Sequence, residues 1–196
     1  WLAGERAELE RLDRDGRVLP VDAAVQAQLE GARAMSIVED GDGRLWLGQT
    51  RGVVRIDPDG RVRRWDRGSV DDATLGGPLD LLRLAPDGSL WMSFAGGGVQ
   101  QRDAVTGRVL TTIAAGPEQG LDVGDNEALD FDAEGRLWIS GSEGLRRWNP
   151  ITGKLEPVDG IDGGERVFAF QFDGHDGLWL QRLSGLEQYR RGDGDG

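Results

Sequence analysis

Short apolar runs separated by turns rich in Gly and Asp follow one another along the whole chain. Five of the seven tryptophans, Trp1, Trp46, Trp91, Trp138 and Trp179, mark this pattern at intervals of roughly 45 residues. The last four lie in similar runs, for example Asp42-Gly43-Arg44-Leu45-Trp46-Leu47. A fixed period in this range indicates one structural unit that is repeated along the chain.

Each period contains four short runs that favour strands. In the second period these are residues 35–39, the run around Trp46, residues 53–56 and residues 62–65, with Gly-centred turns between them. Four antiparallel strands per repeat of this length are typical of a β-propeller blade, whereas solenoid repeats built of strands are shorter. The best helical candidate is the Ala- and Gln-rich segment 22–33, which falls between two blades.

The distribution of apolar side chains supports stacked sheets. In the Trp-containing strand, Leu45 and Leu47 lie on one face and Trp46 on the other, so both faces are apolar. A strand that is buried on both faces lies between two sheets, as a blade lies between its neighbours. The sequence therefore predicts an all-β chain, a β-propeller segment of about four to five antiparallel blades.

The repeats predict where the blades begin and end. We expect a partial blade at residues 1–20, complete blades at about 34–66, 79–113 and 127–158, a second partial blade at 166–191 and a flexible tail at 192–196. Such a segment belongs to a larger ring. Incomplete terminal blades leave apolar faces and strand edges uncovered, so we expect self-association through these ends.

Composition limits the classes of partner. The net charge of −12 argues against nucleic acid and anionic lipid as partners. The absence of cysteine excludes disulfides and a cysteine nucleophile. No signal peptide or apolar run long enough to span a bilayer is present, so contact with a membrane would come only through segments outside these residues.

Motifs that suggest catalysis or metal binding are weak. His175 is the single histidine, lies in a turn and cannot build a His-rich metal site. The acidic run at residues 39–43 lacks the later ligands of a calcium loop and is interpreted as a tight hairpin. The Arg191-Gly192-Asp193 tripeptide is expected by chance in such a tail. We therefore expect no metal, no cofactor and no catalysis.

Two groups of polar residues are candidates for ligand binding. Arg83, Asp130 and Gln171 each stand eight residues before a Trp, at one level of the inner strands that line a propeller's channel. A structural ion pair between Arg83 and Asp130 and a polar channel lining are both open interpretations. Propellers also place binding function on the loops between blades. These loops contain Asp71, Asp72, Glu118, Asp122, Asp125 and Asn126.

Residues 36–57 resemble the two-component regulator propeller repeat. That pattern runs from an inner strand ending in Glu-Asp, through Gly-x-Leu-Trp-Ile-Gly-Thr, to Gly-Gly-Leu-x-Arg-aromatic-Asp, and here it reads Glu39-Asp40, Gly43-Arg44-Leu45-Trp46-Leu47-Gly48 and Gly52-Val53-Val54-Arg55-Ile56-Asp57. Residues 128–149 are similar, ending in Gly144-Leu145-Arg146-Arg147-Trp148-Asn149. The resemblance covers essentially the whole chain.

The resemblance implies a setting for the molecule. Such repeats form seven-bladed propellers in the extracytoplasmic, periplasmic part of bacterial sensors, before a membrane helix and a kinase or cyclase. It implies a non-catalytic module that senses a small molecule or glycan, or that relays a signal. Two alternatives remain open: an enzyme resembling gluconolactonase or streptogramin lyase, whose Asp-Gly-x-Leu-Trp runs are similar, and a protein-interaction scaffold.

Overall fold

The computed structural model describes residues 1–4, 8–29, 33–66, 77–96, 98–121, 126–161, 163–174 and 177–190. These residues form five antiparallel sheets, numbered here from the N-terminus as the first to the fifth sheet. The expected tail at 192–196, His175 and the Arg-Gly-Asp tripeptide lie outside the described residues.

Each sheet is formed by strands that follow one another in the chain. The first contains β1 (Leu2–Ala3), β2 (Leu9–Leu12) and β3 (Val18–Leu19). The second contains β4 (Ala34–Glu39), β5 (Leu45–Gln49), β6 (Gly52–Ile56) and β7 (Val62–Asp66). The third contains β8 (Leu79–Leu84), β9 (Leu90–Phe94), β10 (Gly98–Arg102) and β11 (Val109–Ala114). The fourth contains β12 (Ala128–Phe131), β13 (Leu137–Gly141), β14 (Gly144–Asn149) and β15 (Lys154–Pro157). The fifth contains β16 (Val167–Phe172), β17 (Gly177–Arg182) and β18 (Gly185–Arg190).

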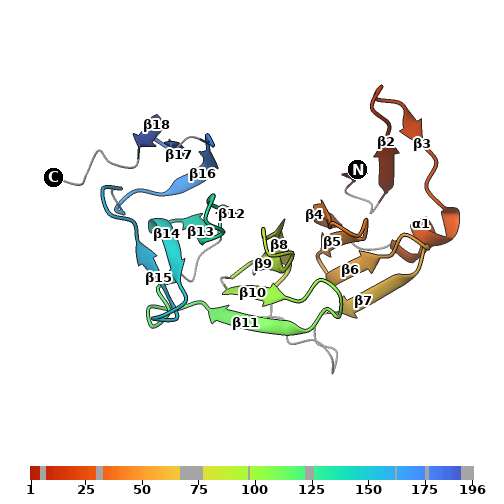
Figure 1. Ribbon diagram of the computed structural model, residues 1–196, viewed down its shortest axis with the longest axis horizontal. Helices are drawn as coiled ribbons and strands as arrows, with labels where there is room; N and C mark the ends of the chain where they lie inside the picture. Colours follow the sequence, from red (N-terminus) through yellow and green to blue (C-terminus); the bar gives the residue numbers. More distant parts are fainter. Residues whose placement is uncertain are drawn as a thin grey trace.

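The five sheets succeed one another around an open arc, with the two ends of the chain well apart (Figure 1). The strands β4, β8 and β12 lie toward the inside of the arc, and β7, β11 and β15 lie toward the outside (Figure 1). This arrangement of four-stranded antiparallel sheets is that of propeller blades, so the predicted fold class is confirmed.

The strands that contain the repeated tryptophans are among the most deeply buried parts of the molecule. Every residue of β5 and of β9 is buried, as expected for strands covered on both faces. The apolar core is divided into clusters at the four junctions between consecutive sheets. At each junction, the face of one sheet that carries the Trp packs against the opposite face of the next sheet. Trp138 of β13, for example, packs with Phe170, Leu178 and Leu180 of the fifth sheet.

A single short helix, α1 (Ala23–Leu29), occurs in the described part of the chain. It lies inside the candidate segment 22–33 and begins after Asp22, whose Oδ1 accepts the backbone N–H of Ala24 at 2.7 Å. Val25 and Leu29 are buried in the cluster between the first and second sheets, so packing stabilises the helix. It is far too short to cross a lipid bilayer, so the described residues contain no helix that could span a membrane.

The acidic turn after β4 is a hairpin, as expected, and it also holds a tryptophan in place. Asp40 Oδ2 accepts the indole N–H of the fully buried Trp46 at 3.1 Å and the Nε–H of Arg44 at 2.7 Å. Burial raises the pKa of Asp40, but these hydrogen bonds and those from backbone N–H groups outweigh burial, so the net pKa is lowered. Asp132 accepts the indole N–H of Trp138 in the same way at 2.8 Å.

Candidate functional site

One rim of the arc carries both the segments that connect consecutive sheets and the hairpin turns between the second and third strands. The two kinds of segment meet because the inner strand runs antiparallel to its neighbour. For example, the backbone N–H of Glu127, just before β12, donates to the carbonyl oxygen of Ser140 near the end of β13 at 2.9 Å. We call this edge the loop rim. In the fourth sheet it comprises residues 115–121, 126–127 and 142–143.

The connection into the fourth sheet lies directly on that sheet's outer strand. The backbone N–H of Leu155 donates to the carbonyl oxygen of Gln119 at 2.8 Å. Gly120 has a φ of 70°, and a Cβ at this position would lie 2.1 Å from the carbonyl oxygen of Leu155. Only glycine fits so close an approach. Leu121 is therefore carried into the apolar cluster between the third and fourth sheets.

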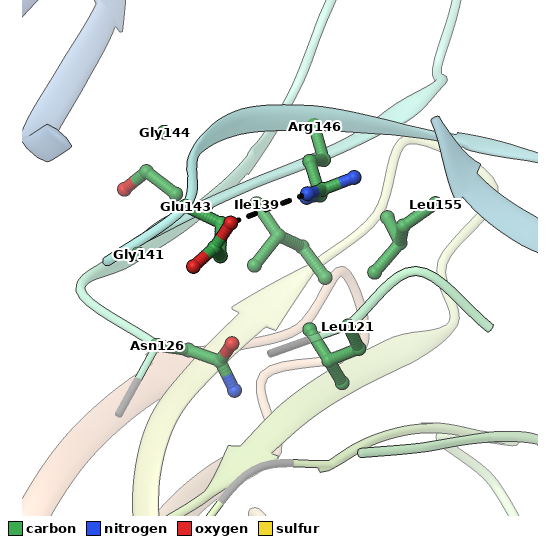
Figure 2. A pocket seen from close by; sticks show the side chains of 9 residues that line it. Leu121, Asn126, Ile139, Gly141, Glu143, Gly144, Arg146 and Leu155 are labelled. Atoms are coloured by element: carbon green, nitrogen blue, oxygen red, sulfur yellow. Dashed lines mark ion pairs between the residues drawn. The ribbon is translucent and has the colours of Figure 1, made fainter. Parts of the chain in front are cut away.

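A small pocket opens under this connection (Figure 2). Its lining comprises Leu121, Asn126, Ile139, Ser140, Gly141, Glu143, Gly144, Arg146 and Leu155. Ile139 and Arg146 share one face because they are directly paired across β13 and β14. The pocket volume of about 20 Å³ is room for one water-sized group.

Three buried donors of the residues that line this pocket lack a hydrogen-bond partner. They are Asn126 Nδ2, Ser140 Oγ and Arg146 Nε, and none of them has a partner among the described residues. Asn126 is only 6% exposed, so bulk water does not satisfy it. Leaving such a donor unpaired costs roughly 1–3 kcal/mol. The pocket can therefore take one acceptor atom, such as the oxygen of a water molecule or of a ligand.

The mouth of the pocket is acidic. The Glu143 side chain is largely exposed, and its Oε2 lies 4.0 Å from Nη2 of Arg146 (Figure 2). One side of the guanidinium thus faces a carboxylate, and Arg146 also lines the pocket. The lining therefore combines buried donors with an exposed acceptor at the mouth.

The loop rim also joins the fourth sheet to the fifth. Glu165, in the connection before β16, accepts both the backbone N–H and the hydroxyl of Ser184 through its carboxylate, at 3.1 and 3.2 Å. Arg166 forms an ion pair with Glu127. Gly144 at the pocket packs against Gly163, since a Cβ on Gly144 would lie 3.0 Å from the Cα of Gly163. The pocket is thus in direct contact with the junction between these two sheets.

The inner-strand candidates occupy equivalent positions, as expected. Arg83, Asp130 and Gln171 are each paired directly with the Trp of the neighbouring strand. Directly paired residues point to the same face, so each side chain lies on the Trp face of its own sheet. Arg83 therefore points toward the fourth sheet, and Asp130 points away from the third.

The ion pair expected between Arg83 and Asp130 does not form, and this prediction is wrong. Within the described residues, Arg83 Nη1 donates to the carbonyl oxygen of Leu82 at 3.0 Å, and Asp130 Oδ1 accepts the backbone N–H of Phe131 at 2.8 Å. The Trp face of each sheet is turned toward the next sheet along the chain. Both side chains therefore point in the same direction along the arc, and β12 lies between the two charges. A role of these residues in lining a channel stays a prediction.

Of the two loop candidates that the structure describes, Asn126 lines the pocket and Glu118 does not. Glu118 is exposed on the connection into the fourth sheet. The remaining candidates, Asp71, Asp72, Asp122 and Asp125, lie outside the described residues. In the part of the chain that the structure describes, no three His, Cys, Asp or Glu side chains are grouped as metal ligands would be.

Arg146 was not among the residues predicted from the sequence. It lies in a Leu-Arg-Arg-Trp run that matches the repeat, and was therefore interpreted as scaffold. The register places it opposite Ile139, whereas Val54 of β6 is opposite Leu47 and Gln100 of β10 is opposite Met92. A charged residue at a position that is uncharged in the two preceding repeats was the available signal.

Comparisons with known proteins agree with this architecture. Residues 28–51 match the two component regulator propeller model. The sequence has no match among curated proteins. An extracellular domain assigned to the hybrid two component system BT3049 of B. thetaiotaomicron has a TM-score of 0.61 at 19% identity, covering 96% of this chain and 24% of that one. The corresponding domain of BT4673 has a TM-score of 0.62 at 19% identity, covering 81% and 20%.

An enzyme has a similar fold. Virginiamycin B lyase from Staphylococcus aureus has a TM-score of 0.63 at 14% identity, covering 93% of this chain and 62% of that one. At these identities the likeness shows the fold alone, and the chain spans only 20% to 24% of the extracellular domains. The chain carries a two component regulator propeller repeat at residues 28–51, within a propeller fold that it shares with extracellular domains of hybrid two component systems.

Proposed function

We propose that the chain is a propeller module of a bacterial sensor of the two component type, which senses a ligand or relays a signal without catalysis of its own. The match of residues 28–51 to the regulator propeller repeat carries this proposal. The fold likeness to extracellular domains supports it and favours an extracytoplasmic position. The partner is a small molecule or a glycan.

The pocket at the loop rim is the place where we expect the ligand to bind. A ligand oxygen inserted there would accept a hydrogen bond from Asn126 Nδ2 or Arg146 Nε, two of the donors that lack partners. A neighbouring hydroxyl could donate to the Glu143 carboxylate at the mouth. Because the pocket has room for one such group, the rest of the ligand would lie on the rim. The net charge of −12 and Glu143 favour a neutral ligand over an anion.

The same position suits signal relay. The pocket is built from the connection before β12 and from the β13–β14 hairpin, whose Gly144 packs against Gly163 in the next connection. A ligand that tightens the hairpin would therefore bias the packing between the fourth and fifth sheets. Such a ligand shifts an equilibrium only by its differential affinity for the two arrangements.

Thermal unfolding with a panel of neutral mono- and oligosaccharides tests this function. A ligand present at 100 times its Kd stabilises the folded state by about 2.7 kcal/mol, which raises the Tm. We expect the shift to be lost in Asn126→Ala and kept in the matched control Glu118→Ala, whose side chain is exposed on the same connection. Recovery of the sugar unchanged by mass spectrometry would agree with sensing, and its conversion to product would favour an enzyme. A panel without any shift, or a shift of equal size in Asn126→Ala, contradicts the proposal.

A further inference from the structure

The lining of the loop-rim pocket is rich in buried hydrogen-bond donors. Asn126 Nδ2 and Arg146 Nε are buried without a partner in the described part of the chain, and each of these atoms can only donate. Ser140 Oγ is also buried and unpartnered there, and it can either donate or accept. Because a buried donor without an acceptor is costly, the group that enters the pocket should bring an acceptor.

A carbonyl oxygen meets this requirement better than a hydroxyl group does. The carbonyl oxygen has two acceptor sites and no hydrogen, whereas a hydroxyl group brings a hydrogen that needs an acceptor of its own. The pocket volume of about 20 Å³ admits one atom of this size. The apolar side chains of Leu121, Ile139 and Leu155 form the rest of one wall. A hydrogen bond made beside them is electrostatically stronger than it would be in water.

The charges around the pocket favour a neutral carbonyl group over a carboxylate. Arg146 carries a positive charge, but Glu143 Oε2 lies 4.0 Å from its Nη2 and offsets it. The chain as a whole has a net charge of −12. A ligand carboxylate would therefore meet repulsion as well as attraction, whereas a neutral group meets neither.

The mouth of the pocket supplies a partner for an amide N–H. A secondary amide is planar and trans, so its C=O and N–H bonds point in opposite directions. With the oxygen inside the pocket, the N–H turns outward, to the side where the largely exposed Glu143 carboxylate lies (Figure 2). A secondary amide thus matches both the buried donors and the exposed acceptor.

We propose that the group inserted into the pocket is the carbonyl oxygen of a secondary amide, supplied by the acetamido group of an N-acetylated amino sugar. The oxygen accepts a hydrogen bond from a buried donor such as Asn126 Nδ2, and the amide N–H donates to Glu143. The sugar ring stays outside, on the loop rim. The choice of a sugar rests on the function proposed above, since a peptide carries the same amide chemistry.

Isothermal titration calorimetry on the full chain tests this ligand class with three matched probes. N-acetylglucosamine carries the acetamido group, glucose has a hydroxyl group at the same carbon, and N-acetylglycine N-methylamide presents the amide without a sugar. Asn126→Asp keeps the size of the side chain and exchanges its donor for an acceptor. Glu143→Leu removes the acceptor at the mouth, whereas Glu143→Gln keeps an acceptor oxygen. Glu118→Ala is the control, and circular dichroism checks that each variant folds.

We expect N-acetylglucosamine to bind at least about tenfold more tightly than glucose, because only the acetamido group supplies an acceptor without a hydrogen. Asn126→Asp should weaken its binding at least about tenfold, and Glu118→Ala should leave it unchanged. Glu143→Leu should weaken binding more than Glu143→Gln does. This ordering would not arise if Glu143 only supplied negative charge, since both substitutions remove that charge.

Equal binding of glucose and N-acetylglucosamine, lost in Asn126→Asp, would overturn the amide assignment and leave the proposed sensing function standing. Tighter binding of N-acetylglycine N-methylamide than of either sugar would overturn the assignment to an amino sugar and place a peptide amide in the pocket. Absence of binding by any probe would overturn the amide assignment. If the wider panel of sugars also gave no Tm shift, the proposed function would fail with it.

Discussion

Replacing Asp40 by Asn tests whether the hairpin acid stabilises the buried Trp46. The substitution keeps the size of the side chain and changes one acceptor oxygen into a donor. Asp40 Oδ1 accepts the backbone N–H groups of Asp42 and Arg44 at 3.1 and 3.0 Å, while Oδ2 accepts from Trp46 and from the Arg44 guanidinium. An Asn that keeps its oxygen on the backbone donors turns its NH₂ group toward two further donors.

The structure sets the size of the effect. The indole N–H of Trp46 is fully buried, and leaving it without an acceptor costs roughly 1–3 kcal/mol. The loss of the charge-assisted bond from Arg44 adds to this cost. We expect Asp40→Asn to lower the free energy of unfolding by about 3 kcal/mol. The matched control is Asp42→Asn in the same turn, whose 70% exposed carboxylate contacts only the Arg44 side chain and should contribute less than about 1 kcal/mol.

Urea denaturation followed by tryptophan fluorescence measures both variants against the unmodified chain. The pKa of Asp40 is lowered in the folded protein, so its contribution to stability is complete above the ordinary value of 3.8 and is lost as the pH falls through the folded pKa. The difference between the unmodified chain and Asp40→Asn should therefore persist at pH 5 to 7 and shrink only below about pH 4. Equal losses for the two variants at neutral pH would refute the role assigned to Asp40.

Three further predictions follow from the packing. Gly107→Ala should lower the free energy of unfolding by more than about 2 kcal/mol in urea denaturation, since φ is 78° and the new Cβ would lie 2.2 Å from the Trp65 ring. The control Gly153→Ala, where φ is 65° and no atom lies close to the new Cβ, should lower it by only about 1 kcal/mol. A double-mutant cycle on Arg83 and Asp130 should give a coupling energy near zero, and a clear coupling would contradict the placement of β12 between them. Circular dichroism should show strand with little helix, and more than roughly a fifth helix would contradict the fold.

The sequence anticipated the strands and turns closely. The inner strand expected at residues 35–39 begins one residue earlier in the structure, at Ala34. The register is irregular near this start, between Ala34 and Ser36. Alternation of apolar residues marks a strand, but a bulge leaves no clear trace in that alternation.

The candidate site was only partly predictable. Asn126 was a candidate because polar residues in long connections are frequent in binding sites. Arg146, which also lines the pocket, lies in a strand whose sequence follows the repeat, and only its charge at a position that is uncharged in the two preceding repeats separates it from scaffold residues. The two residues line one pocket only because the connection folds back over the fourth sheet.

The sequence by itself determined the repeat, the strands within it and the turns between them, because these depend on local spacing and on which residues tolerate a turn. Only the tertiary structure decided which side chains meet across sheets. Arg83 and Asp130 occupy equivalent positions and carry opposite charge. They stay apart because both side chains point toward the next sheet along the chain, which leaves β12 between them. Asp40 and Trp46 do meet, since a hairpin returns one to the other. Contacts within a repeat follow from its own geometry, whereas contacts between repeats depend on how the sheets stack.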